Sequence, residues 1–185
     1  MKRPDTEWRD GRMGDGEWER LLAEQLRHNG RLFFRLAHGI LRNAAAAEDA
    51  CQHALLRAWE QRDAIETSPP ALKGWLARTV INRSLQVVRR SKVERRAVAV
   101  RAEALPESVS PLEGNADRRE AVMAAVGKLP DMSRAVVVMR MLEGMSGGEV
   151  KDLLGCSASE VSRQLHRGLE QLRGMLADCD VGAES

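Results

Sequence analysis

Aromatic residues are scarce in this sequence. Its 185 residues include two Phe, four Trp and no Tyr, so aromatics make up only 3% of the chain. Strands are usually enriched in aromatic side chains, and this scarcity argues against a β-rich fold. Hydrophobic residues still make up 43% of the chain, which favours an aliphatic core between helices. The length fits one domain of ordinary size or two small ones.

Cysteines and long apolar runs are also scarce. Cys51, Cys156 and Cys179 are far apart and form no CxxC motif, which excludes a disulfide framework and a zinc-finger pattern. The four His show no metal-ligand spacing, so we expect neither a metal nor another cofactor. No apolar run approaches the roughly 18 residues that span a bilayer. The polar first 17 residues do not resemble a signal peptide, and we expect a cytoplasmic protein that does not insert into membranes.

Net charge is low but unevenly distributed. The chain carries 29 basic and 27 acidic residues, a balance of +2. Residues 72–101, however, hold nine basic residues against one acidic residue, a local charge of +8 that leaves −6 for the remainder. Such a stripe is typical of a protein that binds the phosphate backbone of a nucleic acid. The alternative is a solvated basic helix end.

Apolar residues recur with helical spacing along most of the chain, which predicts an all-α fold of two small domains. We expect the first domain at 18–96, a flexible linker at 97–116 with Pro106 and Pro111, and the second domain at 117–177. A flexible tail (1–17) and an acidic tail (178–185) flank them. The expected helices are 18–41, 44–60 after an Asn43 cap, 72–92, 117–128, 131–143, 146–154 and 157–176. The β-branched run 136–139 could be read as a strand, but its helical flanks favour a helix.

Two capping-box patterns lie close together near the end of the chain. Ser146 precedes Glu149 by three residues, Ser157 precedes Glu160 in the same way, and Gly155 lies between them. Two capped helices joined by a short Gly-containing turn are typical of a helix-turn-helix, whose second helix enters the major groove of DNA. An ordinary αα-hairpin is the alternative. The side chains predicted to read duplex DNA are Ser157, Ser159, Glu160, Ser162, Arg163, His166 and Arg167.

Two stretches of the sequence resemble a known family. The first is AAEDACQHALLRAW followed by KGWLARTVINRSLQVVRR, and the second is KLPDMSRAVVVMRMLEGMSGGEVKDLLGCSASEVSRQLHRGLEQLR. Their order and spacing are similar to regions 2 and 4 of the extracytoplasmic-function (ECF, group IV) sigma factors of bacterial RNA polymerase. The similarity covers about residues 18–92 and 117–176.

The resemblance implies a division of labour between the domains. Helix 44–60 would dock on the β′ clamp of core RNA polymerase, and the helix-turn-helix would read the −35 promoter element beside the β flap. An anti-sigma factor would be a further partner, and the polymerase would supply all catalytic chemistry. The residues implied in polymerase binding are Asp49, Gln52, His53 and Leu56.

The same resemblance implies that the loop 61–71 and the helix after it bind the −10 element, with one base of the single strand extruded from the stack. Arg78 and Asn82 would contact bases. The full set implied in −10 binding is Arg62, Thr67, Ser68, Lys73, Arg78, Asn82, Arg83, Arg89 and Arg90.

Some residues depart from the family pattern. His53 stands where Glu is usual, and Ser162, Arg163 and Gln164 stand where Lys, Ser and Arg are common. These departures motivate a second hypothesis, a sigma-like decoy that binds an anti-sigma factor without initiating transcription. The basic stripe argues against it. A third hypothesis, a plain helix-turn-helix regulator, leaves the docking helix unexplained.

Overall fold

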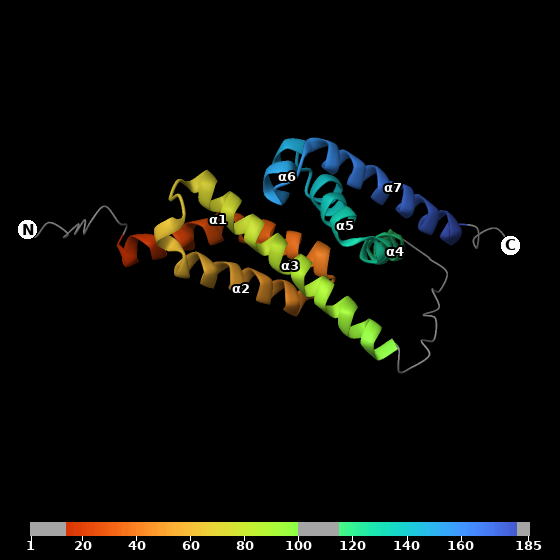
Figure 1. The fold of residues 1–185 in the computed structure, drawn as a ribbon, viewed down its shortest axis with the longest axis horizontal. Coiled ribbons are helices and arrows are strands. Elements are labelled where there is room, and N and C mark those ends of the chain that lie inside the picture. The colour runs from red at the N-terminus through yellow and green to blue at the C-terminus, as the bar shows by residue number, and fades with distance from the viewer. Residues whose placement is uncertain (1–13, 100–114, 181–185) are drawn as a thin grey trace, which may run out of the picture.

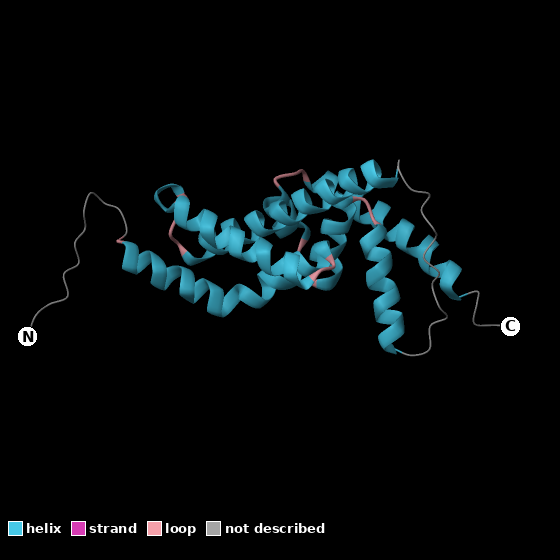
Figure 2. Ribbon diagram, turned by 90° about the horizontal axis from the view of Figure 1, so that it is seen from below, coloured by secondary structure: helices cyan, strands magenta, loops and turns pink. Residues whose placement is uncertain are grey.

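The computed structural model describes residues 14–99 and 115–180, and within these ranges all the regular elements are helices. The first bundle contains α1 (Asp15–Leu41), α2 (Ala44–Glu60) and α3 (Pro69–Ala99), with a 3-10 turn at Arg62–Ala64. The second contains α4 (Asn115–Lys128), α5 (Asp131–Val137), a π-helical segment (Val138–Leu142), α6 (Gly147–Leu154) and α7 (Ala158–Asp180), as Figures 1 and 2 show. The predicted all-α fold is confirmed. Most of the expected linker and parts of both expected tails lie outside the described residues.

Small side chains bring α2 close to its neighbours. The Asn43 side chain accepts a 2.8 Å hydrogen bond from the Ala46 amide, as expected of an N-cap. The inward face of α2 is then made of four buried alanines, Ala47, Ala50, Ala54 and Ala58. They belong to the same hydrophobic core as larger buried side chains from α1 and α3, the two helices that α2 contacts, including Leu36, Ile40, Leu72, Leu76 and Val80. The polar residues of α2 are consequently directed outward.

Helix α3 is longer than the sequence suggested. It begins at Pro69, three residues before the expected start, and continues to Ala99. Prolines are well tolerated in a first helical turn because their missing N–H would have no partner there. The start is also anchored from α1, where the buried Gln25 donates a 3.1 Å hydrogen bond to the Pro69 carbonyl. The loop between α2 and α3 is correspondingly shorter.

The second bundle contains a widened turn. The Glu143 amide donates to the Val138 carbonyl at 3.0 Å, five residues back, so the backbone widens from α to π geometry after α5. The β-branched run 136–139 is buried and helical across this junction. The strand alternative for that run is therefore excluded, and the preference for a helix is confirmed.

The two bundles are packed together. Figure 1 shows the second bundle lying along α1 and α3 of the first. The Arg134 guanidinium, which is buried, donates to the Ile40 carbonyl at 3.0 Å, and Arg35 forms a 2.8 Å ion pair with Glu143. Gly39 allows this close approach, since a Cβ there would lie 2.7 Å from Cγ1 of Val138. In the described part of the chain, no helix is both long and apolar enough to cross a membrane.

Candidate nucleic-acid and polymerase interfaces

The predicted helix-turn-helix is formed by α6 and α7. The Glu149 amide donates to Ser146 Oγ at 3.2 Å, and the Ser146 amide donates to the Glu149 carboxylate at 2.7 Å, which completes the first capping box. The bonds from the Ser146 backbone and then from its hydroxyl hold the pKa of the Glu149 carboxyl below its usual value. Helix α6 ends at Gly155, whose positive φ of 63° is readily adopted by glycine.

The second predicted box is formed only in part. The Glu160 amide donates to Ser157 Oγ at 3.1 Å, so Ser157 caps α7 as expected. The Glu160 carboxylate points further along the helix, where it receives Gln164 Nε2 at 2.7 Å and Arg163 Nη1 at 2.9 Å. Glu160 is therefore oriented by the side chains that follow it.

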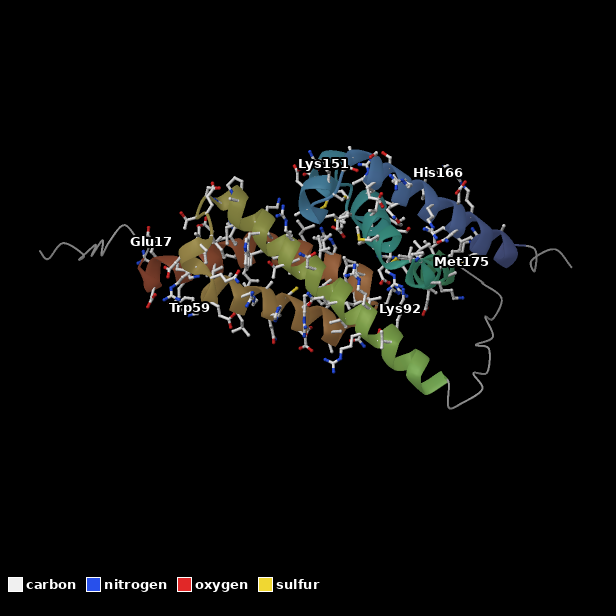
Figure 3. The ribbon with its side chains drawn as sticks, in the orientation of Figure 1. Glu17, Trp59, Lys92, Lys151, His166 and Met175 are labelled. Carbon is white, nitrogen blue, oxygen red and sulfur yellow. The ribbon has the colours of Figure 1, made fainter. Side chains whose placement is uncertain are left out.

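The outer face of α7 carries the residues predicted to read duplex DNA. Val161 and Leu172 are buried on the inner face, which directs the polar residues of the same helix to solvent. Figure 3 labels His166 on this helix, where its ring pairs with Glu170 at 3.1 Å. Glu160 is half-buried, and the remaining members of the predicted set are exposed: Ser157, Ser159, Ser162, Arg163, His166 and Arg167.

Gln164, which departs from the family pattern and is not in the set predicted to read DNA, lies on another side of α7. It is half-buried, and its side-chain oxygen accepts a 2.7 Å hydrogen bond from Ser133 on α5. Position 164 thus faces the neighbouring helix. The helical repeat alone hints at this, because 161, 164, 165 and 168 share one side of a helix.

A groove between α2 and α3 lies among the residues predicted to bind the −10 element. Arg78, Asn82 and Arg83 line it, together with Trp75 and His53. The groove is open to solvent. Of the other predicted residues on α3, Lys73, Arg89 and Arg90 are exposed.

The loop before α3 contributes the other predicted −10 residues. Thr67 is exposed and Ser68 is half-buried. Arg62 lies over the Trp59 ring, with 5.3 Å between its Cζ and the ring centroid, and it is 3.5 Å from Asp15. The guanidinium of Arg62 is therefore oriented by its own bundle.

The predicted polymerase-binding residues do not all share one environment. Asp49, Gln52 and Leu56 are exposed on α2, and Leu56 retains 65% of its accessible surface, which is high for a large apolar side chain. His53 is half-buried and lines the groove facing α3. His53 is therefore directed partly toward α3, because residue 53 is rotated about 100° around the helix from residue 52.

Contacts from the second bundle engage several of the basic side chains of α3. Arg78 donates to the backbone carbonyl of Asp152, at the end of α6. Lys92 pairs with Asp131 at the start of α5, and Arg89 Nε lies 3.8 Å from the same carboxylate. Figure 3 labels Lys92 on α3 and Lys151 on α6, on the two sides of this contact. None of these contacts follows from a pattern within α3, because each partner lies in the second bundle.

Comparison with known proteins assigns the chain to a family. Residues 26–93 match the model of Sigma-70 region 2, and residues 119–172 match that of Sigma-70 region 4. The ECF RNA polymerase sigma factor SigE of Mycolicibacterium smegmatis is 32% identical over 170 residues, covering 86% of this chain. The RNA polymerase sigma-E factor of Streptomyces coelicolor is 34% identical over 166 residues, covering 89% of this chain and 90% of that protein. This chain belongs to the ECF sigma factors. The resemblance found in the sequence is thereby confirmed.

Solved structures agree with the fold of this sigma factor. A sigma factor RpoE from Bartonella quintana, in complex with the anti-sigma factor NepR, is similar with a TM-score of 0.63 and 19% identity, over 84% of this chain and 96% of that one. CnrH, in complex with the cytosolic domain of CnrY, gives a TM-score of 0.62 and 22% identity, over 90% and 91%. The chain spans 62% of the length of the mycobacterial SigE.

Proposed function

We propose that this sigma factor binds core RNA polymerase and directs it to a set of promoters by reading duplex −35 and single-stranded −10 elements. The observation that carries the proposal is the combination of two family regions in one chain, at residues 26–93 and 119–172, with a capped helix-turn-helix in the second. A plain helix-turn-helix regulator has no need of the first region. A decoy has no need of the basic α3.

The division of the chain follows the same proposal. The segment 18–96 engages the polymerase and the −10 element, 97–116 connects the domains, and 117–177 engages the −35 element. Asp49, Gln52 and Leu56 dock on the β′ clamp, because an exposed leucine beside polar groups suits a protein interface. The open groove of α2 and α3, lined by Arg78 and Asn82, accommodates an extruded base.

The proposal includes partners and a location. The second bundle lies beside the β flap when bound to polymerase, and the whole protein acts in the cytoplasm without catalytic activity of its own. One of the similar solved structures is a sigma factor bound to the anti-sigma factor NepR. A partner of that class is therefore proposed for this chain.

Run-off transcription tests the function directly. Fragmented genomic DNA is transcribed by core polymerase with and without this protein, and core binding is measured in parallel by gel filtration. We expect transcripts from new start sites only when the protein is added. Core binding without new transcripts would favour the decoy, whereas DNA binding without core binding would favour the plain regulator.

Variants separate the proposed surfaces. Arg163→Ala and Asn82→Ala should each abolish or relax promoter choice while core binding is retained, because both side chains are exposed on surfaces proposed to meet DNA. Asp49→Ala should weaken core binding, measured by anisotropy of the labelled protein. Release from core polymerase by Asn82→Ala or Arg163→Ala would contradict this assignment of faces.

A further inference from the structure

A chain of hydrogen bonds connects the core of the second bundle to the DNA-facing surface of α7. It starts at Ser133, a buried residue of α5 whose Oγ donates to Gln164 Oε1 at 2.7 Å. Gln164 Nε2 donates to Glu160 at 2.7 Å, and the second Glu160 oxygen accepts from Arg163 at 2.9 Å. The Arg163 side chain at the end of the chain is 69% exposed.

The chemistry of each group determines the direction of this chain. An ionised carboxylate only accepts hydrogen bonds, so Glu160 must face the amide nitrogen of Gln164. The amide oxygen then points to Ser133, whose hydroxyl donates to it. The Gln164 amide is fixed by Ser133 at one end and by Glu160 at the other, and this fixes the Glu160 carboxylate. The planar guanidinium of Arg163, which pairs with that carboxylate, is therefore pre-oriented before it meets DNA.

We propose that Gln164 is a positioning residue that directs Arg163 toward one base pair of the −35 element. The proposal rests on the function proposed above. A pre-oriented guanidinium donates two parallel hydrogen bonds to guanine O6 and N7, whereas a mobile one also reaches neighbouring positions and phosphates. Gln164 therefore contributes to the choice of sequence without touching DNA.

The test uses holoenzyme and a promoter obtained from the run-off experiment. Each base pair of its −35 element is varied in turn, and affinity is measured for wild type, Arg163→Ala and Gln164→Leu. Gln171→Leu is the matched control, because Gln171 is exposed two turns further along α7. We expect Gln164→Leu to lose about 5- to 10-fold of selectivity at the base pair where Arg163→Ala also loses selectivity, and nowhere else.

The outcomes are distinct. A uniform drop in affinity at all positions, or unchanged selectivity in Gln164→Leu, would overturn the positioning role. No loss in Arg163→Ala would instead overturn the reading of DNA by Arg163, which belongs to the proposed function. If Gln164→Leu does not fold, Ser133→Ala breaks the other end of the chain and should weaken selectivity at the same base pair.

The contact between the bundles carries a second, independent inference. The second bundle presents two kinds of negative group to α3: the Asp131 carboxylate, which meets Lys92 and Arg89, and the carbonyl of Asp152, which accepts from Arg78. That carbonyl belongs to the last turn of α6, where the helix dipole is negative. These groups attract the same basic side chains that phosphates would attract.

The Arg35–Glu143 ion pair joins the two bundles and can form only while they are packed together. Glu143 follows the π-helical segment, and its side chain is only 6% exposed, although that of Arg35 remains 56% exposed. Hydrogen bonds and attraction from Glu143 raise the pKa of Arg35. Opening the bundles would leave Glu143 without this cation.

We infer that the sigma factor, when not bound to polymerase, is self-occluded: its second bundle engages Arg78 and Arg89, two basic side chains of α3 that are proposed to bind −10 DNA, in contacts of its own. This inference also rests on the proposed function. The Arg78 donor that bonds to Asp152 is not available to a promoter strand while this contact lasts. Opening of the contact therefore precedes engagement of the −10 element.

The double variant Asp131→Asn/Glu143→Gln tests self-occlusion in the full chain. Glu24→Gln/Glu120→Gln is its control, since it changes the net charge equally at two exposed positions away from these ion pairs. Small-angle X-ray scattering measures the radius of gyration, and anisotropy measures affinity for a single-stranded −10 oligonucleotide from the run-off promoter. If the closed form holds about nine-tenths of the molecules, we expect a larger radius and about tenfold tighter binding in the test variant only.

An unchanged radius of gyration would overturn the closed arrangement. A larger radius without tighter binding would overturn the occlusion, and so would an equal gain in the control variant. Absence of oligonucleotide binding at every protein concentration, in wild type and in the expanded variant, would overturn the −10 assignment itself. Thermal unfolding of both double variants identifies any loss of folding. If the test variant does not fold, Lys92→Gln removes the cation that pairs with Asp131 and should also open the contact.

Discussion

Replacing Gly39 by alanine perturbs the contact between the bundles through a single methyl group. Gly39 is buried near the end of α1, and its new Cβ would lie 2.7 Å from Cγ1 and 3.2 Å from Cγ2 of Val138. Carbon atoms normally approach to about 3.5–4.0 Å. Val138 is fully buried and β-branched, so its side chain has little freedom to turn away.

Two opposing free-energy changes determine the effect of Gly39→Ala. Overpacking of this kind costs about 1–3 kcal/mol, and the cost arises only while the bundles touch. Alanine in place of glycine stabilises a helix by about 0.5–1 kcal/mol, whether or not they touch. The closed arrangement should therefore lose about 5- to 150-fold in population relative to the open one, while the first bundle becomes slightly more stable.

Scattering and thermal unfolding measure the two effects separately. Gly30→Ala is the control on the same helix, because its Cβ would lie 3.4 Å from Cδ1 of Leu26, at the end of a flexible side chain. We expect Gly39→Ala to enlarge the radius of gyration and Gly30→Ala to leave it unchanged. The reasoning is refuted if Gly39→Ala keeps the wild-type radius, or if it lowers the unfolding temperature of the first bundle.

Three further predictions concern the bundles themselves. Gly168→Ala should destabilise the second bundle by about 1–3 kcal/mol in urea unfolding, because its Cβ would lie 2.8 Å from Cγ2 of Val137 on α5. Glu149 has a lowered pKa in the folded protein, so its contribution to stability is present above the unfolded pKa and is lost as pH falls through the folded one. Acid unfolding of Glu149→Gln should lack this component, and an identical pH profile in both proteins would contradict it. Burial raises the pKa of the Cys51 thiol from 9.0 to about 11; stability from this group is present below pH 9.0 and is lost as pH rises toward 11. Alkylation of Cys51, followed by peptide mass spectrometry, should therefore be slow at pH 8 in the native protein and faster in urea.

Local signals explain how much could be predicted from the sequence. The Asn43 cap, the Ser146 box and the Gly155 turn involve residues within a few positions of each other, and each was predicted correctly. The all-α fold followed from apolar periodicity. These features depend only on residues that are close together in the sequence, so a short segment is enough to predict them.

Non-local contacts explain what could not be predicted. The start of α3 at Pro69 depends on Gln25, which is 44 residues away in the chain. The inward position of Gln164 depends on Ser133, and the engagement of Arg78 depends on Asp152. No pattern within one helix reports which distant side chain will complete a hydrogen bond. The site residues on each helix were therefore easier to propose than their orientation.

The π-helical segment has a consequence for how this molecule could diverge from its relatives. A π turn accommodates one more residue than an α turn, so deleting one residue between Val138 and Leu142 would restore a regular α-helix. Every later position would then rotate by about 100° around the axis and move back by about 1.5 Å. Glu143 would leave Arg35 although neither residue had changed. A one-residue deletion in this segment would thus change the angle at which α6 and α7 are held relative to the first bundle.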